Sequence, residues 1–260
     1  MEKLYQKQIF WWDFMSRNYL ILGASSDIGI ELVKEITKRE NQTTIWAHYF
    51  SSDKCLRGIK QINKNKIIPI RADFSKTDDI MNLFLNIQES NKIPTSIVHL
   101  SAPKLSYQKF KDINWYDCVQ DVQIQVGAVF KILQLFLPSI IKTEYRAKIV
   151  FMLSENTIHQ PAKFSTKYTM SKYMLLGLMK SLAVEYAGKN VDINALSPSM
   201  IDTKFLRDID RRMLEISGAT DNILNPCDVL PWLWKLLSEY SDGINGQNIM
   251  FSGGEVLIEE

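Results

Sequence analysis

Short apolar runs alternate with amphipathic segments along most of this 260-residue chain. Seven runs have the length of buried β-strands, at 18–23, 43–48, 66–70, 96–101, 147–153, 190–196 and 247–251. Between them, apolar residues recur at helical spacing in the segments 28–40, 53–63, 77–90, 114–137, 168–187 and 226–239. Alternation of this kind predicts an α/β fold, a doubly wound parallel sheet of about seven strands with helices on both faces. We expect a single domain over residues 17–260.

Residues 1–16 precede this pattern and are predicted to form an N-terminal extension. The segment carries Phe10, Trp11, Trp12 and Phe14 but lacks the continuous apolar core and small-residue cleavage site of a signal peptide. Three interpretations stay open: a start-site artefact, a strap on the surface, or a contact with a partner subunit.

The first strand ends in a glycine-rich turn that leads into a helix. Gly23 allows a tight turn, and Gly29 allows the helix to pack closely on the strand. Ser25 and Ser26 offer hydroxyl groups, and the helix N-terminus offers free N–H groups that suit a pyrophosphate. The alternative is an ordinary turn in which the glycines serve geometry alone.

Tyr168 and Lys172 stand four residues apart, on one face of a predicted helix. An ammonium beside a phenol favours the phenolate, so we expect Lys172 to lower the pKa of Tyr168 and make it a general acid/base. The alternative is a pair on a solvated helix face. Ser154 ends a buried strand and either points into a ligand cleft or caps the next turn.

These motifs, in this order, resemble the short-chain dehydrogenase/reductase family, of the single-domain type that includes 3-oxoacyl-[acyl-carrier-protein] reductases. The fingerprint Thr-Gly-x-x-x-Gly-x-Gly is similar to Leu22–Gly29, and Tyr-x-x-x-Lys matches Tyr168 and Lys172. Ser154 lies 14 residues before Tyr168, where the family has its catalytic serine. The Pro-Gly-x-x-x-Thr motif resembles Pro198–Thr203, and the last strand with its Gly-Gly turn resembles Gly246–Gly254.

The resemblance implies a Rossmann-like, NADP(H)- or NAD(H)-dependent oxidoreductase that moves a hydride between the nicotinamide and a carbonyl or alcohol substrate. It assigns proton donation to Tyr168, pKa lowering and ribose binding to Lys172, and binding of the substrate oxygen to Ser154. It also implies homo-dimers or homo-tetramers built through the long helices. The expected cofactor-binding residues are Gly23, Ser25, Ser26, Asp27, Ile28, Gly29, His48, Ser51, Ser52, Asp73, Phe74, Ser101, Ala102, Pro198, Ile201 and Thr203.

Several positions depart from the family pattern. Asp27 replaces the middle glycine; we interpret it as a helix cap that also brings a carboxylate near the pyrophosphate. The segment His99–Ala102 replaces Asn-Asn-Ala-Gly, and Ser199 replaces the glycine after Pro198. Gln125 takes the place of the catalytic asparagine, so its longer amide either anchors the water of a proton relay to Lys172 or disrupts that relay. These departures motivate an alternative: a nucleotide-binding protein with little or no turnover, used as a sensor or in assembly.

The cofactor preference is predicted from the second strand. NAD sites usually carry an acid near its end, but no acid appears here before Asp53. The neutral Ser51 and Ser52, with His48 and the nearby Lys54, suit a 2′-phosphate, so NADP(H) is favoured over NAD(H), although no arginine stands at the expected place. Asp73 resembles the adenine-contacting acid of the family, or caps the following helix, or does both.

Composition limits the partners and the cellular compartment that we expect for this protein. The 31 basic and 29 acidic residues nearly cancel, which argues against nucleic acid or an anionic membrane as a partner. Cys55, Cys118 and Cys227 are scattered, as in a cytoplasmic protein, and the three histidines form no metal motif. No apolar run approaches the roughly 18 residues that span a bilayer.

The segment from Thr203 to Asn225 is predicted to be a substrate lid. It combines an apolar helical stripe with Arg207, Arg211 and Arg212, which suit an anionic or phosphopantetheine-carrying substrate if they face the cleft. A solvated amphipathic helix is the alternative.

Overall fold

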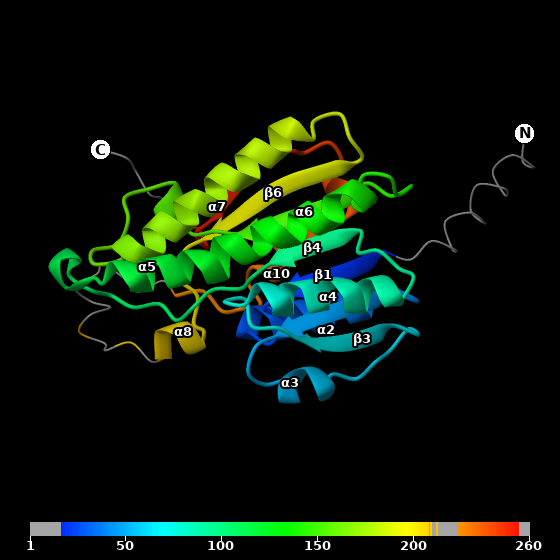
Figure 1. The fold of residues 1–260 in the computed structure, drawn as a ribbon, viewed down its shortest axis with the longest axis horizontal. Coiled ribbons are helices and arrows are strands. Elements are labelled where there is room, and N and C mark those ends of the chain that lie inside the picture. The colour runs from blue at the N-terminus through cyan, green and yellow to red at the C-terminus, as the bar shows by residue number, and fades with distance from the viewer. Residues whose placement is uncertain (1–16, 208, 210–211, 213–222, 255–260) are drawn as a thin grey trace, which may run out of the picture.

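The computed structural model describes residues 17–207, 209, 212 and 223–254. Within them, seven parallel strands form one sheet in the order β3-β2-β1-β4-β5-β6-β7, which confirms the predicted fold class (Figure 1). The strands are β1 (Asn18–Leu22), β2 (Thr44–Tyr49), β3 (Lys66–Arg71), β4 (Ser96–His99), β5 (Ala147–Met152), β6 (Val191–Pro198) and β7 (Asn248–Phe251). The extension 1–16 lies outside the described residues.

The helices cover both faces of the sheet. They are α2 (Asp27–Arg39), α3 (Lys54–Arg57), α4 (Thr77–Glu89), α5 (Trp115–Val122), α6 (Ala128–Ile140), α7 (Thr166–Glu185), α8 (Lys204–Arg207) and α10 (Leu230–Leu237). The helix predicted at 53–63 is wrong in length, because α3 makes a single turn and Gly58 follows it directly. Asn63 and Lys64 then have positive φ values of 55° and 56°, which no helix accommodates.

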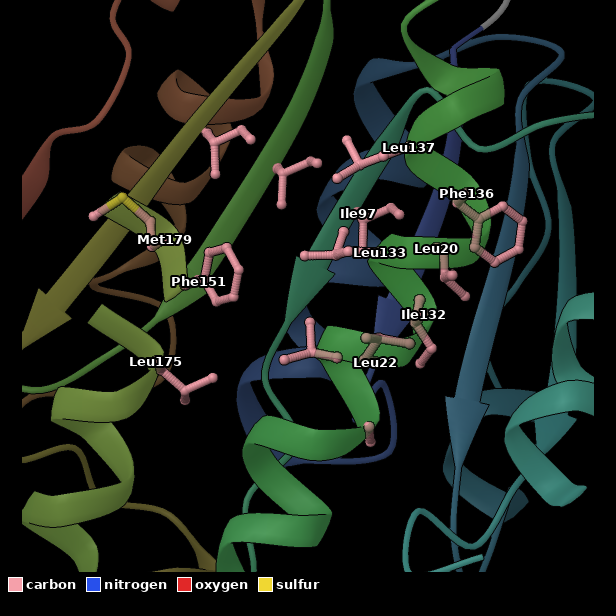
Figure 2. Close-up of a cluster of buried hydrophobic side chains, with 14 of the residues drawn as sticks. Leu20, Leu22, Ile97, Ile132, Leu133, Phe136, Leu137, Phe151, Leu175 and Met179 are labelled. Carbon is pink, nitrogen blue, oxygen red and sulfur yellow. The ribbon is translucent and has the colours of Figure 1, made fainter. Parts of the chain in front are cut away.

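Two apolar layers hold the helices to the sheet. Leu20, Leu22 and Ile97 of the sheet face α6 and α7, and Figure 2 shows Phe136 and Leu175 of those helices packed toward them. On the opposite face, α2 and α10 bury their own apolar stripes against β1, β2 and β5. Alternate residues along each strand therefore serve different layers, as expected for a sheet that is covered on both sides.

The long helical stretch Trp115–Ile140 is long and apolar enough, by length and composition, to cross a membrane. Half of its most apolar window is buried inside the molecule, so it is the core helix that packs on the sheet. Asp117, Asp121 and Lys131 interrupt it, so it is not an uninterrupted apolar run of the kind that the sequence was said to lack. A π-helical turn at Gln123–Gly127 interrupts it between α5 and α6.

The strand order reverses beside β1, which pairs with β2 on one side and β4 on the other. The connections after β1 and β4 therefore leave the sheet in opposite directions, and a crevice opens at their carboxyl ends. The glycine turn after β1 and the segment after β4 meet at this crevice. All sequence motifs from Gly23 to Thr203 follow strands that end at the same edge.

Candidate active site

The glycine turn is held by contacts that only glycine permits. Gly23 has φ +85°, and a Cβ there would lie 2.9 Å from the backbone nitrogen of Ser101. A Cβ on Gly29 would lie 2.6 Å from the carbonyl oxygen of Gly23. Close approach of α2 to the end of β1 therefore needs glycine at both positions. This close approach leaves the first turn of α2 facing the crevice.

Ser26 caps α2, and Asp27 does not. The Ser26 hydroxyl accepts the Gly29 N–H at 3.1 Å and donates to the Gly23 carbonyl at 2.7 Å. The interpretation of Asp27 as the cap is therefore wrong, since the preceding residue takes that place. Asp27 lies in the first turn, where its charge complements the helix dipole. Its carboxylate accepts the backbone N–H of Lys204 at 2.7 Å, which connects the glycine turn to the start of α8.

His48 is a structural residue. Its buried ring accepts the Gly23 N–H at Nδ1, 2.9 Å away, and donates from Nε2 to the Ala72 carbonyl, 3.1 Å away. Phe74 stacks on it with ring centroids 3.9 Å apart. Burial lowers the pKa of His48 to about 4, so the ring is neutral. Both ring nitrogens are hydrogen-bonded within the protein and neither remains for a phosphate, which contradicts the prediction that His48 binds the 2′-phosphate.

Ser154, Tyr168 and Lys172 lie together at one wall of the crevice. Ser154 follows β5 and caps the turn after it, accepting the Asn156 N–H at 3.3 Å, and it also hydrogen-bonds Tyr168. Lys172 is buried and donates from Nζ to the Met152 carbonyl at 2.9 Å. Its Nζ lies 5.4 Å from the centre of the Tyr168 ring. The three side chains that sequence motifs singled out thus face one space.

The pKa of Tyr168 moves opposite to the expectation. Burial raises it to about 12, although the hydrogen bond from Ser154 lowers it. Burial also lowers the pKa of Lys172 to about 8. Lys172 has therefore lost its charge at the pH where the phenol ionises, so it does not favour the phenolate there. The prediction of a lowered tyrosine pKa is therefore wrong, and Tyr168 is a neutral phenol at physiological pH.

Gln125 and His99 occupy the layer between the sheet and the long helices. Gln125 sits in the π-helical turn, and its buried Oε1 has no hydrogen-bond partner among the described residues. The buried His99 ends β4; its ring nitrogens make no hydrogen bond of good geometry with the described residues, although the Gln125 backbone lies close enough to raise its pKa. Burial and the Lys172 charge lower the pKa of His99 to about 3. Sequence reasoning noted His99 only as a departure from the family pattern; its place beside Lys172 depends on the sheet register.

A cleft of about 200 Å³ joins the glycine turn to the Tyr168 wall. Its lining is mainly apolar and includes Leu105, Tyr107, Met200, Phe205 and Leu206. Several predicted cofactor residues also line it: Ser26, Asp27, Ile28, Ala102, Pro198, Ile201 and Thr203. The hydroxyls of Ser101 and Ser199 are buried nearby without partners among the described residues.

The remaining predicted residues lie at the ends of β2 and β3. Ser51 and Ser52 are exposed beyond β2. Asp73 accepts hydrogen bonds from the hydroxyl and N–H of Ser75, at 2.7 and 3.0 Å, and the hydroxyl lowers its pKa. It closes this turn and does not cap α4, whose cap residue is Lys76. Arg211 and residues 208, 210 and 213–222 of the predicted lid lie outside the described residues.

The family model for the short chain dehydrogenases matches residues 17–213 of this chain. The chain is 29% identical, over 246 residues, to the 3-oxoacyl-[acyl-carrier-protein] reductase FabG of Thermotoga maritima, a match that covers 92% of this chain and 97% of that protein. It is 28% identical over 161 residues to the oxidoreductase UcpA of Salmonella typhimurium, and this match spans 58% of this chain and 61% of that protein.

Solved structures share the fold at lower identity. A 3-oxoacyl (acyl-carrier-protein) reductase from Agrobacterium tumefaciens C58 with NADP bound has a TM-score of 0.78 and 20% identity, covering 92% of this chain and 94% of that one. A 3-oxoacyl-[acyl-carrier protein] reductase from Brucella melitensis with bound NAD has a TM-score of 0.75 and 20% identity, covering 93% and 91%. Together with the family model, the shared architecture leads to one assignment: this chain belongs to the short chain dehydrogenase family.

Proposed function

We propose that this protein is an NADP(H)-dependent oxidoreductase that transfers a hydride between the nicotinamide and a carbonyl or alcohol substrate. The observation that carries the proposal is the convergence of Ser154, Tyr168 and Lys172 on the cleft that begins at the glycine turn. A phenol, a hydroxyl and an ammonium around one space suit proton transfer to a carbonyl oxygen.

In this proposal the nicotinamide supplies the hydride, and the protein's own residues supply the proton. Tyr168, whose pKa is about 12, is protonated at neutral pH and donates to the carbonyl oxygen. Ser154, which is hydrogen-bonded to Tyr168, donates a second hydrogen bond to the carbonyl oxygen of the substrate. Lys172, charged below its pKa of about 8, stabilises the negative charge left on the phenol. Reduction is therefore the direction that the resting protonation states favour.

The glycine turn fits a dinucleotide. The absence of side chains at Gly23 and Gly29 opens the first turn of α2, where backbone N–H groups suit a pyrophosphate. Ser101, Ala102, Pro198, Ile201 and Thr203 would extend this site along the crevice. NADP(H) is favoured over NAD(H) because no acidic residue stands at the end of β2 to bind a ribose 2′-hydroxyl. The strand ends at Tyr49, and the exposed, neutral Ser51 and Ser52 follow it.

The apolar lining of the cleft favours an uncharged carbonyl substrate over an anionic one. A carbonyl reductase or alcohol dehydrogenase activity follows, and a 3-oxoacyl thioester is the first candidate because the relative from Thermotoga maritima carries that activity in its name. The arginine face of the lid adds no support, because Arg211 lies outside the described residues and the exposed Arg212 does not line the cleft.

We further propose a cytoplasmic homo-dimer or homo-tetramer, with no nucleic acid or membrane as partner. Trp115, Tyr116, Met170, Tyr173 and Met174 expose apolar surface on α5 and α7, which suits a second copy of the chain. All three cysteines are free, as in a reducing compartment.

A second candidate function is a nucleotide-binding protein with little turnover. The buried Gln125 amide, whose oxygen lacks a partner among the described residues, favours it, since a longer side chain stands in the family's asparagine position.

The test is NADPH oxidation, followed by absorbance, with a 3-oxoacyl thioester and a panel of uncharged ketones. The proposal expects turnover that falls by about a hundredfold or more in Tyr168→Phe, the scale of lost acid–base catalysis. Gln125→Asn is the discriminating variant. A large gain in rate for Gln125→Asn, over a wild type that binds NADPH but scarcely turns over, would favour the second candidate.

A further inference from the structure

A ring of hydrogen bonds connects the turn that carries Ser154 to the last two strands of the sheet. Three side chains form it: Thr157 lies in the turn after β5, Ser197 belongs to β6, and Asn248 begins β7. Thr157 and Ser197 are buried, and Asn248 is half-buried. None of the three is among the described residues that line the cleft. The ring therefore acts on the reaction only through the residues that it holds.

One arrangement of protons satisfies every group in this ring. The Thr157 hydroxyl donates to the Ser154 carbonyl at 2.8 Å, and the same carbonyl accepts the Thr157 N–H at 2.9 Å. Nδ2 of Asn248 donates to Thr157 Oγ1 at 3.2 Å, and Oδ1 of Asn248 accepts the Ser197 hydroxyl at 2.6 Å. Because each hydroxyl has a single proton, the amide must present its nitrogen to Thr157 and its oxygen to Ser197.

A second contact holds the same turn against α7. Asn156 precedes Thr157, and its Nδ2 donates to Thr169 Oγ1 at 3.2 Å. Thr169 follows Tyr168 directly in the helix. The turn is thus fixed to α7 on one side and to β6 and β7 on the other. A shift of Thr157 would move the Ser154 backbone, and with it the hydroxyl that bonds Tyr168.

We infer that Asn248 is a positioning residue for the proposed reaction, because it holds Thr157 and so fixes the Ser154 hydroxyl toward the substrate oxygen. The inference rests on the proposed function and adds a residue of β7 to it. Asn248→Asp has nearly the same shape but offers no donor to Thr157. The Thr157 hydroxyl then turns to the new carboxylate and releases the Ser154 carbonyl.

The test is steady-state reduction of an uncharged ketone by NADPH, with kcat, the KM for the ketone and the Kd for NADPH measured separately. The variants are Asn248→Asp, Thr157→Val, which lacks the hydroxyl, and Thr157→Ser, which retains it. Melting temperatures report how far each variant is destabilised. If Asn248→Asp does not fold, the comparison of Thr157→Val with Thr157→Ser decides the same question.

Asn245→Asp is the matched control, with the same chemical change in the loop before β7. Nδ2 of Asn245 donates to the Ala183 carbonyl at 2.8 Å, and its Oδ1 accepts the Ile193 N–H at 2.9 Å. These contacts go to α7 and β6 and not to the turn that carries Ser154. The control therefore separates a loss of stability from a loss of positioning.

The expected result is a fall in kcat of about tenfold or more in Asn248→Asp and in Thr157→Val, the scale of a misplaced reacting group, with the Kd for NADPH unchanged. Thr157→Ser should retain most of the rate, and Asn245→Asp all of it. The double variant Thr157→Val with Asn248→Asp should be no slower than Thr157→Val alone, because both changes act through one hydroxyl.

An unchanged kcat in Asn248→Asp would overturn the inference and leave the proposed oxidoreductase standing. Additive losses in the double variant would overturn it too, since Asn248 would then act apart from Thr157. An equal fall in Asn245→Asp would trace the effect to stability and reject the positioning role. A wild type that binds NADPH but reduces no carbonyl compound would overturn the proposed function and the inference together.

Discussion

At Tyr168 and Lys172, burial outweighs the interaction between the two side chains. The pKa of the phenol rises to about 12 and that of the ammonium falls to about 8. The sequence spacing correctly suggests that the two side chains meet, and the separation of 5.4 Å from Nζ to the ring centre agrees. The direction of the tyrosine shift could not be predicted, because it depends on burial by residues distant in sequence.

The rate of carbonyl reduction should fall as the pH rises through about 8. Below that pH, Lys172 is charged and stabilises the phenolate that forms when Tyr168 donates its proton; above it, the lysine is neutral. A pH profile of kcat with saturating NADPH checks this. Lys172→Arg keeps its charge throughout this range, so any activity it retains should be flat across pH 8. An identical fall in that variant would exclude Lys172 as the titrating group.

Asp192 should make stability sensitive to acid. Burial raises its pKa, but hydrogen bonds from Arg146 and Lys148, at 2.7 and 2.9 Å, outweigh burial and lower it. A lowered folded pKa contributes stability above the unfolded pKa of about 4, and this stability is lost as the pH falls further. Asp192→Ala should lower the free energy of unfolding by about 1–3 kcal/mol at pH 7, because the buried Lys148 then keeps only the half-exposed Asp242 as its acidic partner. Urea unfolding of the wild type and the variant at pH 7 and at pH 3 measures the two free energies of unfolding. A difference between the proteins that does not shrink at pH 3 would contradict this prediction.

At the scale of elements, the alternation of strands and helices was predictable, and most boundaries agree within about two residues. The misses have local causes. The segment 53–63 was expected to be helical from its apolar spacing, but positive φ values at Asn63 and Lys64 belong to a turn. The π-helical turn at Gln123–Gly127 was not predicted from the spacing of apolar residues; it lies between α5 and α6 and packs against α7.

Asp27 joins two elements that lie far apart in sequence. Its carboxylate holds the N–H of Lys204 at the start of α8, beside the turn where a pyrophosphate is expected. Asp27→Gly restores the family residue and removes a negative charge from that turn. We expect NADPH affinity to rise severalfold, because repulsion is relieved, while the melting temperature without ligand falls slightly. Calorimetric titration of both proteins measures the change; weaker NADPH binding in the variant would show that the Lys204 contact supports the cofactor site.

The contact between β1 and α2 should tolerate no side chain at Gly29. A Cβ there would lie 2.6 Å from one backbone atom and 2.7 Å from two others, so the helix must shift. We expect Gly29→Ala to lower the free energy of unfolding by about 1–3 kcal/mol, the usual cost of overpacking. Gly177→Ala is the matched control, because its Cβ would meet nothing within 4 Å and helices favour alanine. Equal stability of Gly29→Ala and the wild type, in urea titrations, would contradict the described packing.

At the scale of the whole molecule, the sheet gathers residues from Gly23 to Leu206 around one crevice. The order of motifs in the sequence predicts this arrangement, because parallel strands end at the same edge. Contacts between neighbouring strands are less predictable. Arg71 reaches Phe50 across the register of β2 and β3, and His48 joins three loops at once. Contacts of this kind can be identified only once the pairing register of the strands is known.

The apolar surface of α5 and α7 should pair with a second copy of the chain. Tyr173 is 47% exposed on α7, and Trp115 is 65% exposed on α5. Tyr173→Glu places a charge there and should shift the protein toward monomers, as measured by light scattering during gel filtration. Leu85→Glu on α4, at a site 48% exposed, is the control and should leave the assembly unchanged. A wild type that is monomeric at all concentrations would refute the pairing.

The most direct test of the central claim is the melting temperature of the protein titrated with NADPH and with NADH. A ligand that binds only the folded state stabilises it by about 2.7 kcal/mol at a hundredfold excess over Kd. The account predicts a rise of several degrees with NADPH and a smaller rise with NADH at the same concentration. No shift with either dinucleotide would contradict the claim that the glycine turn and its crevice form a cofactor site.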